Sequence, residues 1–223
     1  MKHYHLLLSV CSIPKIASAQ SESNPDRWEI GVDALSLFGK NSMPAYSLFG
    51  RYLINPEGKK EAFLRTSLGY QSNRKILDAP QNDIRFQDSK SESWKIAIGF
   101  QKEILSNSSF SFYYGGDLIY QQKIEDESGS YKVNGGEVGW YSYEDLKSFS
   151  ETRFVGFFGF STNPTKKIKI SLESGIFAGR TSFQQNYLGF YPNSEIAAIG
   201  YNSSIRAISG FQPFYQLLFT LTL

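Results

Sequence analysis

The chain ends in Tyr-Gln-Leu-Leu-Phe-Thr-Leu-Thr-Leu, residues 215–223, and this stretch decides the fold class. Every odd position is apolar or aromatic, and three of the four even positions are polar. A period of two places alternate side chains on opposite faces of a β-strand. The last strand of a soluble sandwich is one interpretation. A strand that closes a membrane barrel is the other, because lipid covers one of its faces and the lumen the other.

The same alternation recurs in seven earlier segments. One residue set of each segment is apolar or aromatic, and the other is polar, small or charged. Glycine, proline, serine and asparagine separate the segments, as expected for turns. Eight strands are therefore predicted, at about residues 27–38, 46–54, 64–70, 94–101, 110–121, 154–160, 168–176 and 205–223.

The connections between these segments alternate in length. Short turns are predicted at 55–60, 106–109 and 163–166, and longer connections fall between them. Transmembrane barrels have short turns on the periplasmic side and longer loops outside. We therefore predict an all-β fold, an eight-stranded antiparallel up-and-down transmembrane β-barrel with short periplasmic turns and longer external loops. The longer connections are predicted at 39–43, 72–92, 122–149 and 181–203.

Aromatic residues fall near the two ends of the apolar faces, with aliphatic residues and glycine between them. Aromatic rings favour the two interfaces of a bilayer, where an apolar ring body meets a polar edge. High strand propensity alone would not sort these residues by strand end. The predicted girdles consist of Trp28, Tyr46, Tyr70, Trp94, Phe100, Phe110, Phe112, Tyr120, Phe154, Phe160, Phe211 and Phe219.

Charged residues lie on the opposite face of the same segments. A soluble barrel would be apolar inside, since unpaired buried charges are costly. In a membrane barrel of eight strands the interior holds only side chains, so these charges are expected to pair as a salt-bridged plug. The predicted lumen network consists of Glu29, Asp33, Arg51, Arg65, Lys95, Glu103, Asp117, Arg153, Lys169, Glu173 and Arg206.

Residues 1–20 are predicted to be a cleaved signal peptide. Lys2 precedes a short apolar region, and Ala17-Ser18-Ala19 forms a small-x-small cleavage site. Residues 21–26 would be a short lead, and 27–223 the barrel domain. Cleavage would remove every histidine and the one cysteine of the chain, and it would leave 21 Lys+Arg against 21 Asp+Glu.

This composition bears on function. Without histidine or cysteine the mature chain lacks the usual pairs that activate a nucleophile, so no enzyme activity, metal or cofactor is predicted. Acidic residues 125–127 could hold a hard cation weakly, although such a run more often faces water. A net charge near zero does not favour nucleic-acid binding.

The sequence resembles the small outer-membrane β-barrel proteins of Gram-negative envelopes. This group includes the OmpA transmembrane domain, OmpX, OmpW and the broad outer-membrane β-barrel domain family. The resemblance rests on Ala17-Ser18-Ala19, the eight alternating segments and the ending at 215–223. It implies residence in the outer membrane, contact with its lipid, and assembly by periplasmic chaperones and the barrel-assembly machinery. The assembly signal would be Tyr215, Leu217, Phe219, Leu221 and Leu223.

Three functions fit these predictions. The first is a non-enzymatic barrel that supports the envelope or binds an unknown surface ligand through its external loops. Trp140, Tyr141 and Tyr143 are the candidate contact residues. The second is a small pore or transport channel, which the narrow bore and the balanced charges oppose. The third is an exported, soluble, lipocalin-like binder, which requires an apolar interior.

Overall fold

The structure is a computed structural model that describes residues 28–35, 47–54, 61–77, 84–107, 109–133, 139–165, 167–191 and 196–223. These residues form eight β-strands, each antiparallel to its neighbours in the chain, and β1 pairs with β8 to close the ring. The predicted eight-stranded antiparallel up-and-down barrel is confirmed. The strands are β1 (Trp28–Asp33), β2 (Ser47–Leu53), β3 (Ala62–Leu77), β4 (Ile84–Ser106), β5 (Phe110–Val133), β6 (Gly139–Thr162), β7 (Ile168–Phe190) and β8 (Ile196–Thr222).

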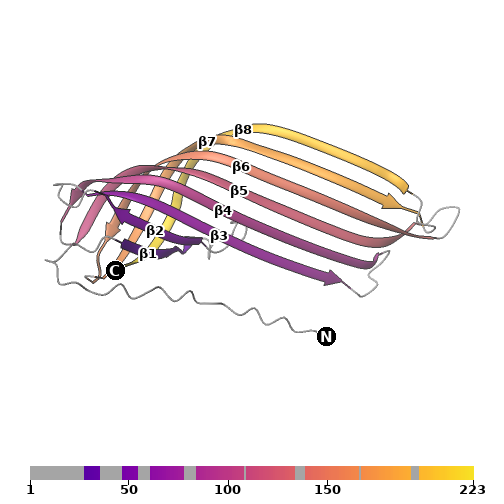
Figure 1. The fold of residues 1–223 in the computed structure, drawn as a ribbon, viewed down its shortest axis with the longest axis horizontal. Coiled ribbons are helices and arrows are strands. Elements are labelled where there is room, and N and C mark those ends of the chain that lie inside the picture. The colour runs from indigo at the N-terminus through magenta and orange to yellow at the C-terminus, as the bar shows by residue number, and fades with distance from the viewer. Residues whose placement is uncertain are drawn as a thin grey trace.

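The strands differ greatly in length. β1 and β2 have 6 and 7 residues, whereas β5 and β6 have 24 each. The ring is therefore closed by described residues only near the end that holds Trp28 and Leu223, and the long strands continue beyond it as one sheet (Figure 1). The outer sheet is this continuation, residues 70–77, 84–94, 122–133, 139–150, 182–190 and 196–205.

The predicted long loops are wrong in extent. The strands run through most of 72–92, 122–149 and 181–203, and the connections at that end shrink to 78–83, 134–138 and 191–195. Both faces of the outer sheet carry polar residues, so apolar alternation is weak there and the sequence reads as loop. These connections are about as long as those at the opposite end of the strands, at 54–61, 107–109 and 163–167. The strict alternation of short and long connections is therefore not present.

The outside of the closed barrel is apolar. Leu68, Ile98, Leu118 and Ile176 are each more than half exposed. The apolar belt is the set of such outward-facing side chains on all eight strands. It includes Ile30, Val32, Leu48, Leu64, Leu68, Ile96, Ile98, Leu118, Phe154, Phe158, Leu172, Ile176, Phe219 and Leu221.

The inside of the barrel mixes a small apolar cluster with buried charges. Val155 and Phe157 of β6 pack with Ala97, Tyr113, Ile119 and Tyr215. Arg65 and Glu173 are as deeply buried as these apolar residues, at 1% and 0% exposed. Buried ions beside exposed leucines reverse the polarity that water-soluble domains have.

Predicted girdle residues lie on the outside of the barrel, and some of them make ring contacts there. Trp28 contacts Tyr52 near the closed end, with ring centroids 4.7 Å apart. Trp94 and Tyr120 contact beside the outer sheet, at 5.0 Å. Tyr46 lies outside the described residues. Of the other predicted members, Tyr70, Phe100, Phe112, Phe154, Phe160, Phe211 and Phe219 are exposed and Phe110 is partly buried.

A bulge in β8 changes the facing of one predicted residue. Glu173 pairs with Gln216, but Gly175 pairs with Gln212, so extra residues of β8 oppose β7. Pro213 lies in this bulge, where its missing N–H costs no ladder bond. As a result Tyr215 turns into the barrel, at 8% exposed, instead of facing outward as predicted.

The other residues of the ending keep the predicted phase. Phe219, Leu221 and Leu223 are exposed and Leu217 is partly buried, whereas Gln216, Leu218 and Thr220 are buried. Leu223 N also donates to Trp28 O at 3.0 Å, which joins the end of the chain to β1. No helix among the described residues is long and apolar enough to cross a membrane.

Candidate functional site

One half of the lumen network is centred on Glu29 of β1. Arg51 Nε donates to Glu29 Oε2 at 2.6 Å, and Lys169 Nζ donates to Oε1 at 2.9 Å. Thr220 Oγ1 donates to Oε2 at 3.2 Å. These residues come from β1, β2, β7 and β8, so one carboxylate joins the strands on both sides of the barrel seam.

The other half is centred on Arg65 of β3. Its two terminal nitrogens donate to the two carboxylate oxygens of Glu173, each at 2.9 Å. Arg65 Nε lies 3.2 Å from Asp117 Oδ1, and Nη2 donates to Gln216 Oε1 at 2.6 Å. The guanidinium carbon also lies 4.1 Å from the ring centroid of Phe157. This bidentate geometry suits arginine and not lysine.

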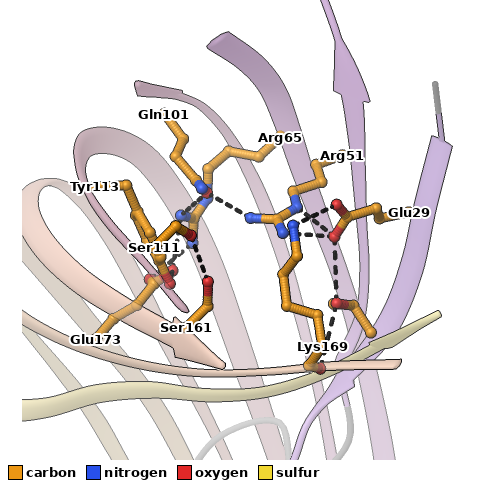
Figure 2. A network of polar contacts seen from close by, with 10 residues as sticks. Glu29, Arg51, Arg65, Gln101, Ser111, Tyr113, Ser161, Lys169 and Glu173 are labelled. Carbon is orange, nitrogen blue, oxygen red and sulfur yellow. Dashed lines mark hydrogen bonds and ion pairs between the residues drawn. The ribbon is translucent and has the colours of Figure 1, made fainter. Parts of the chain in front are cut away.

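Gln101 of β4 joins the two halves (Figure 2). Its Oε1 accepts from Arg51 Nη1 at 3.1 Å and from Arg65 Nη1 at 3.2 Å. Tyr113 donates its hydroxyl to Glu173 at 3.0 Å, and Tyr215 donates to Asp117 at 2.7 Å. Glu29 and Glu173 therefore each accept from charged and neutral donors, whereas Asp117 accepts from Tyr215 and forms an ion pair with Arg65.

The arrangement fills the bore with paired charges. Three bases, Arg51, Arg65 and Lys169, face three acids, Glu29, Asp117 and Glu173. The six side chains come from five strands and are at most 14% exposed. Such a network can hold strands in register and block passage, and it presents no nucleophile with an adjacent base. The described residues contain no group of three or more His, Cys, Asp or Glu placed to hold a metal ion.

Five further predicted lumen residues lie on the same face as these six paired ions. Asp33 is buried near the barrel mouth, where its Oδ1 accepts from the N–H groups of Leu35 and Leu217. Arg153 pairs with Glu151 at 3.2 Å and lies over the ring of Phe177. By register, the other three face the same side as the network. Glu103 is buried, Lys95 is partly buried and Arg206 is exposed.

Sequence reasoning missed the neutral members of the network. Gln101, Tyr113 and Gln216 occupy polar-phase positions of their strands. An uncharged glutamine or an aromatic residue at such a position looks like an ordinary exposed side chain. The available signal was Tyr113, an aromatic residue out of phase with Phe112 and Tyr114.

The three candidate contact residues lie on β6, not in a loop. Tyr143 donates its hydroxyl to Glu127 Oε1 at 2.7 Å and stacks on Tyr187, with centroids 6.2 Å apart. Tyr141 contacts Tyr191 at 5.4 Å, and Trp140 pairs with Lys132 through the backbone. Burial, and then the bond to Glu127, raise the pKa of the Tyr143 phenol well above its usual value. Tyr141 and Tyr143 are on the lumen-phase side of the outer sheet.

The barrel mouth is the end at which the closed barrel meets the outer sheet. A cavity of about 500 Å³, the mouth cavity, opens there. Phe149 and Phe183 line it, with ring centroids 4.7 Å apart. Gln121, Glu151 and Arg206 supply polar groups to the same cavity, and Gln121 Nε2 donates to Glu151 Oε2 at 3.0 Å. This volume is in the range of small-molecule sites.

No protein-family model, curated protein or solved structure matches the chain. The resemblance to small outer-membrane barrels therefore stays a prediction from the sequence. Roles for individual residues rest on the geometry of this chain alone.

Proposed function

We propose that this chain is a non-enzymatic outer-membrane β-barrel protein that supports the envelope or binds a surface ligand. One observation carries the proposal, namely the reversed polarity of the closed barrel. Leucine, isoleucine and phenylalanine side chains are exposed around its outside, while Arg65, Asp117 and Glu173 are buried inside. A lipid solvent explains both halves of this pattern, since lipid favours an apolar exterior and leaves the interior to polar pairs.

The dimensions of the apolar belt support a bilayer. On β4 the outward-facing side chains are apolar from Trp94 to Phe100, and Ile104 and Leu105 follow after the single exposed Lys102; beyond Trp94 they become Glu92, Lys90 and Asp88. A tilted strand needs roughly 9–11 residues to cross a membrane. A soluble domain rarely exposes an apolar patch larger than a few hundred Å². A lipocalin-like soluble binder is disfavoured because the interior carries the charges.

The lumen network supports an anchor over a pore. The paired side chains occupy the bore, and Gln101 closes the gap between Arg51 and Arg65. In this proposal the barrel holds the outer sheet above the membrane, where it can meet ligands. The pore alternative has a direct test, the current through planar bilayers. We expect no steady conductance from the native chain, and single-channel currents altered in Arg65→Ala would support the pore instead.

Export and assembly complete the proposal. The predicted signal peptide at 1–20 and lead at 21–26 lie outside the described residues. We propose that export delivers the chain to periplasmic chaperones and the barrel-assembly machinery, and that the ending at 215–223 serves as the assembly signal. Its partners are then outer-membrane lipid and, at the surface, an unidentified ligand.

Cell fractionation with a gel-mobility assay tests the proposal. We expect the full chain in the detergent-resistant envelope fraction, migrating differently with and without boiling, because a closed barrel resists denaturation by detergent until heated. A soluble periplasmic protein of similar mass serves as the fractionation control. Recovery in the soluble periplasmic fraction, with no mobility shift, would overturn the proposal.

A further inference from the structure

An aromatic ladder lies on the inner face of the outer sheet, the face continuous with the lumen. Its rings form three contacting pairs between β6 and the end of β7. Their centroids are 4.7, 6.2 and 5.4 Å apart in order from the barrel mouth outward. The ladder consists of Phe149 with Phe183, Tyr143 with Tyr187, and Tyr141 with Tyr191.

The rungs are evenly spaced along β7. Phe183 and Tyr187 of β7 and Tyr191, the residue that follows β7, are four residues apart, a spacing that keeps them on one side of an extended chain. Four residues of a strand span about 13 Å, and the ladder is therefore about 26 Å long. A platform of this length exceeds a single small ring and suits an extended chain of flat units.

Neither lipid nor a packed core explains these rings. Phe149 is 40% exposed although it faces the inner side, and Tyr191 is 43% exposed. Beside Phe149 and Phe183 the outward-facing neighbours are Ser150 and Ser182, so the polarity of the apolar belt is inverted at this pair. Exposed aromatic faces on an otherwise polar surface are typical of ligand sites.

Acceptor groups flank the ladder and are held in place. Asp145 accepts two bonds from Gln185 Nε2, at 2.8 and 3.0 Å. Glu127 accepts from Tyr143 and from Gln87 Nε2 at 2.7 and 2.8 Å. A carboxylate has about four acceptor sites, so each keeps capacity for further donors.

Three ion pairs lie beside the ladder. Lys123 contacts Glu125, Lys147 lies 2.9 Å from Asp145, and Arg153 lies 3.2 Å from Glu151. The presence of these carboxylates disfavours a phosphate backbone, which binds where lysine and arginine dominate. The ligand that fits is neutral, rich in hydroxyl donors and flat on at least one face.

We propose that the inner face of the outer sheet binds an extended neutral oligosaccharide, whose sugar rings stack along the aromatic ladder and whose end unit occupies the mouth cavity. The C–H face of a pyranose is weakly positive and meets the negative face of an aromatic ring. Its hydroxyls donate to the fixed carboxylates, which are strong acceptors. The inference names the ligand class of the proposed surface-binding function and rests on that function.

Calorimetric titration of the full mature chain tests this inference. The chain is kept in lauryldimethylamine oxide, because a sugar-based detergent would compete for the site. The probes are maltohexaose, cellohexaose and chitohexaose, each beside its own disaccharide, and a twelve-residue oligothymidylate. We expect at least one hexasaccharide to bind about tenfold more tightly than its disaccharide, since it spans more rungs. Absence of binding by all three hexasaccharides, affinity independent of length, or binding of the oligothymidylate alone would overturn the inference.

Two variants locate the site. Tyr187→Ala, in the ladder, is expected to lower hexasaccharide affinity about tenfold. Tyr201→Ala is the matched control, because Tyr201 is 68% exposed on the opposite face of neighbouring β8. Equal affinities of the two variants would refute the ladder as the site. The heat-dependent gel shift of each variant shows separately whether its barrel is folded. If the chain fails the fractionation test but still binds the oligosaccharide, the membrane proposal is wrong and the ligand inference stands.

Discussion

Removing Arg65 is expected to destabilise the barrel more than any surface change. The guanidinium makes the bidentate bond to Glu173, the contact with Asp117 and bonds to Gln101 and Gln216. Arg65→Met keeps an aliphatic side chain but leaves two buried carboxylates without their cation. Breaking a buried ion pair in this way costs about 3–5 kcal/mol.

Urea unfolding of the refolded barrel in detergent micelles measures this loss. With a slope of about 1–3 kcal/mol/M, a loss of this size lowers the midpoint by at least about 1 M. Arg180→Met is the matched control, because Arg180 is exposed on the outward face of β7 and such changes stay within about 0.5 kcal/mol. Tryptophan fluorescence and the gel shift should report the same midpoint if unfolding is two-state.

A triple variant separates charge from packing. Arg65→Met combined with Asp117→Asn and Glu173→Gln removes the uncompensated charges, so most of the lost stability should return. A single Arg65→Met variant as stable as Arg180→Met would refute the network as a stabilising feature. A triple variant at least as unstable as the single one would show that the cost lies in packing.

Three further predictions concern assembly, packing and titration. Phe219→Asp places a charge in the apolar belt of the last strand, and pulse-labelled cells should show it retained in the periplasm; normal insertion would contradict the proposed assembly role. Gly159→Ala drives a methyl group into the buried Tyr113 ring and should cost about 1–3 kcal/mol in urea unfolding. Gly50→Ala, whose added carbon has its nearest neighbour at 3.5 Å, is the control and should cost far less. In an ultraviolet titration compared with Tyr143→Phe, the Tyr143 phenol should stay protonated above pH 10.0. Its contribution to stability is complete below that pH and is lost as the pH rises further, and normal titration would refute the partly buried bond to Glu127.

Strand number and phase could be predicted because one physical pattern determines both. In the closed barrel every strand has an apolar outward face and a lumen face, so Ile96 and Ile98 alternate with Lys95 and Ala97. The lumen phase of Glu29, Arg51, Arg65, Asp117, Lys169 and Glu173 followed from the same alternation. Which acid would meet which base did not follow, because partners such as Arg65 and Glu173 lie on strands far apart in sequence.

The outer sheet could not be predicted, because its two faces do not differ in the same way. Residues such as Ser148, Ser150 and Lys147 are polar on both sides of β6, so the strand resembles a loop. The bulge at 212–216 was missed for a different reason. The extra residues of β8 in this bulge turn the Tyr215 side chain into the barrel. The residues after the bulge keep the same alternation as before it.

The lipid contact of the apolar belt is the central claim, and nitroxide accessibility tests it most directly. A spin label at Ile98→Cys, in the belt, is compared in vesicles with one at Gln184→Cys, on the outward face of the outer sheet. We predict that the label at position 98 collides with oxygen and is shielded from a water-soluble nickel complex, whereas the label at 184 meets the nickel complex freely. Equal access of the nickel complex to both labels would contradict the membrane barrel.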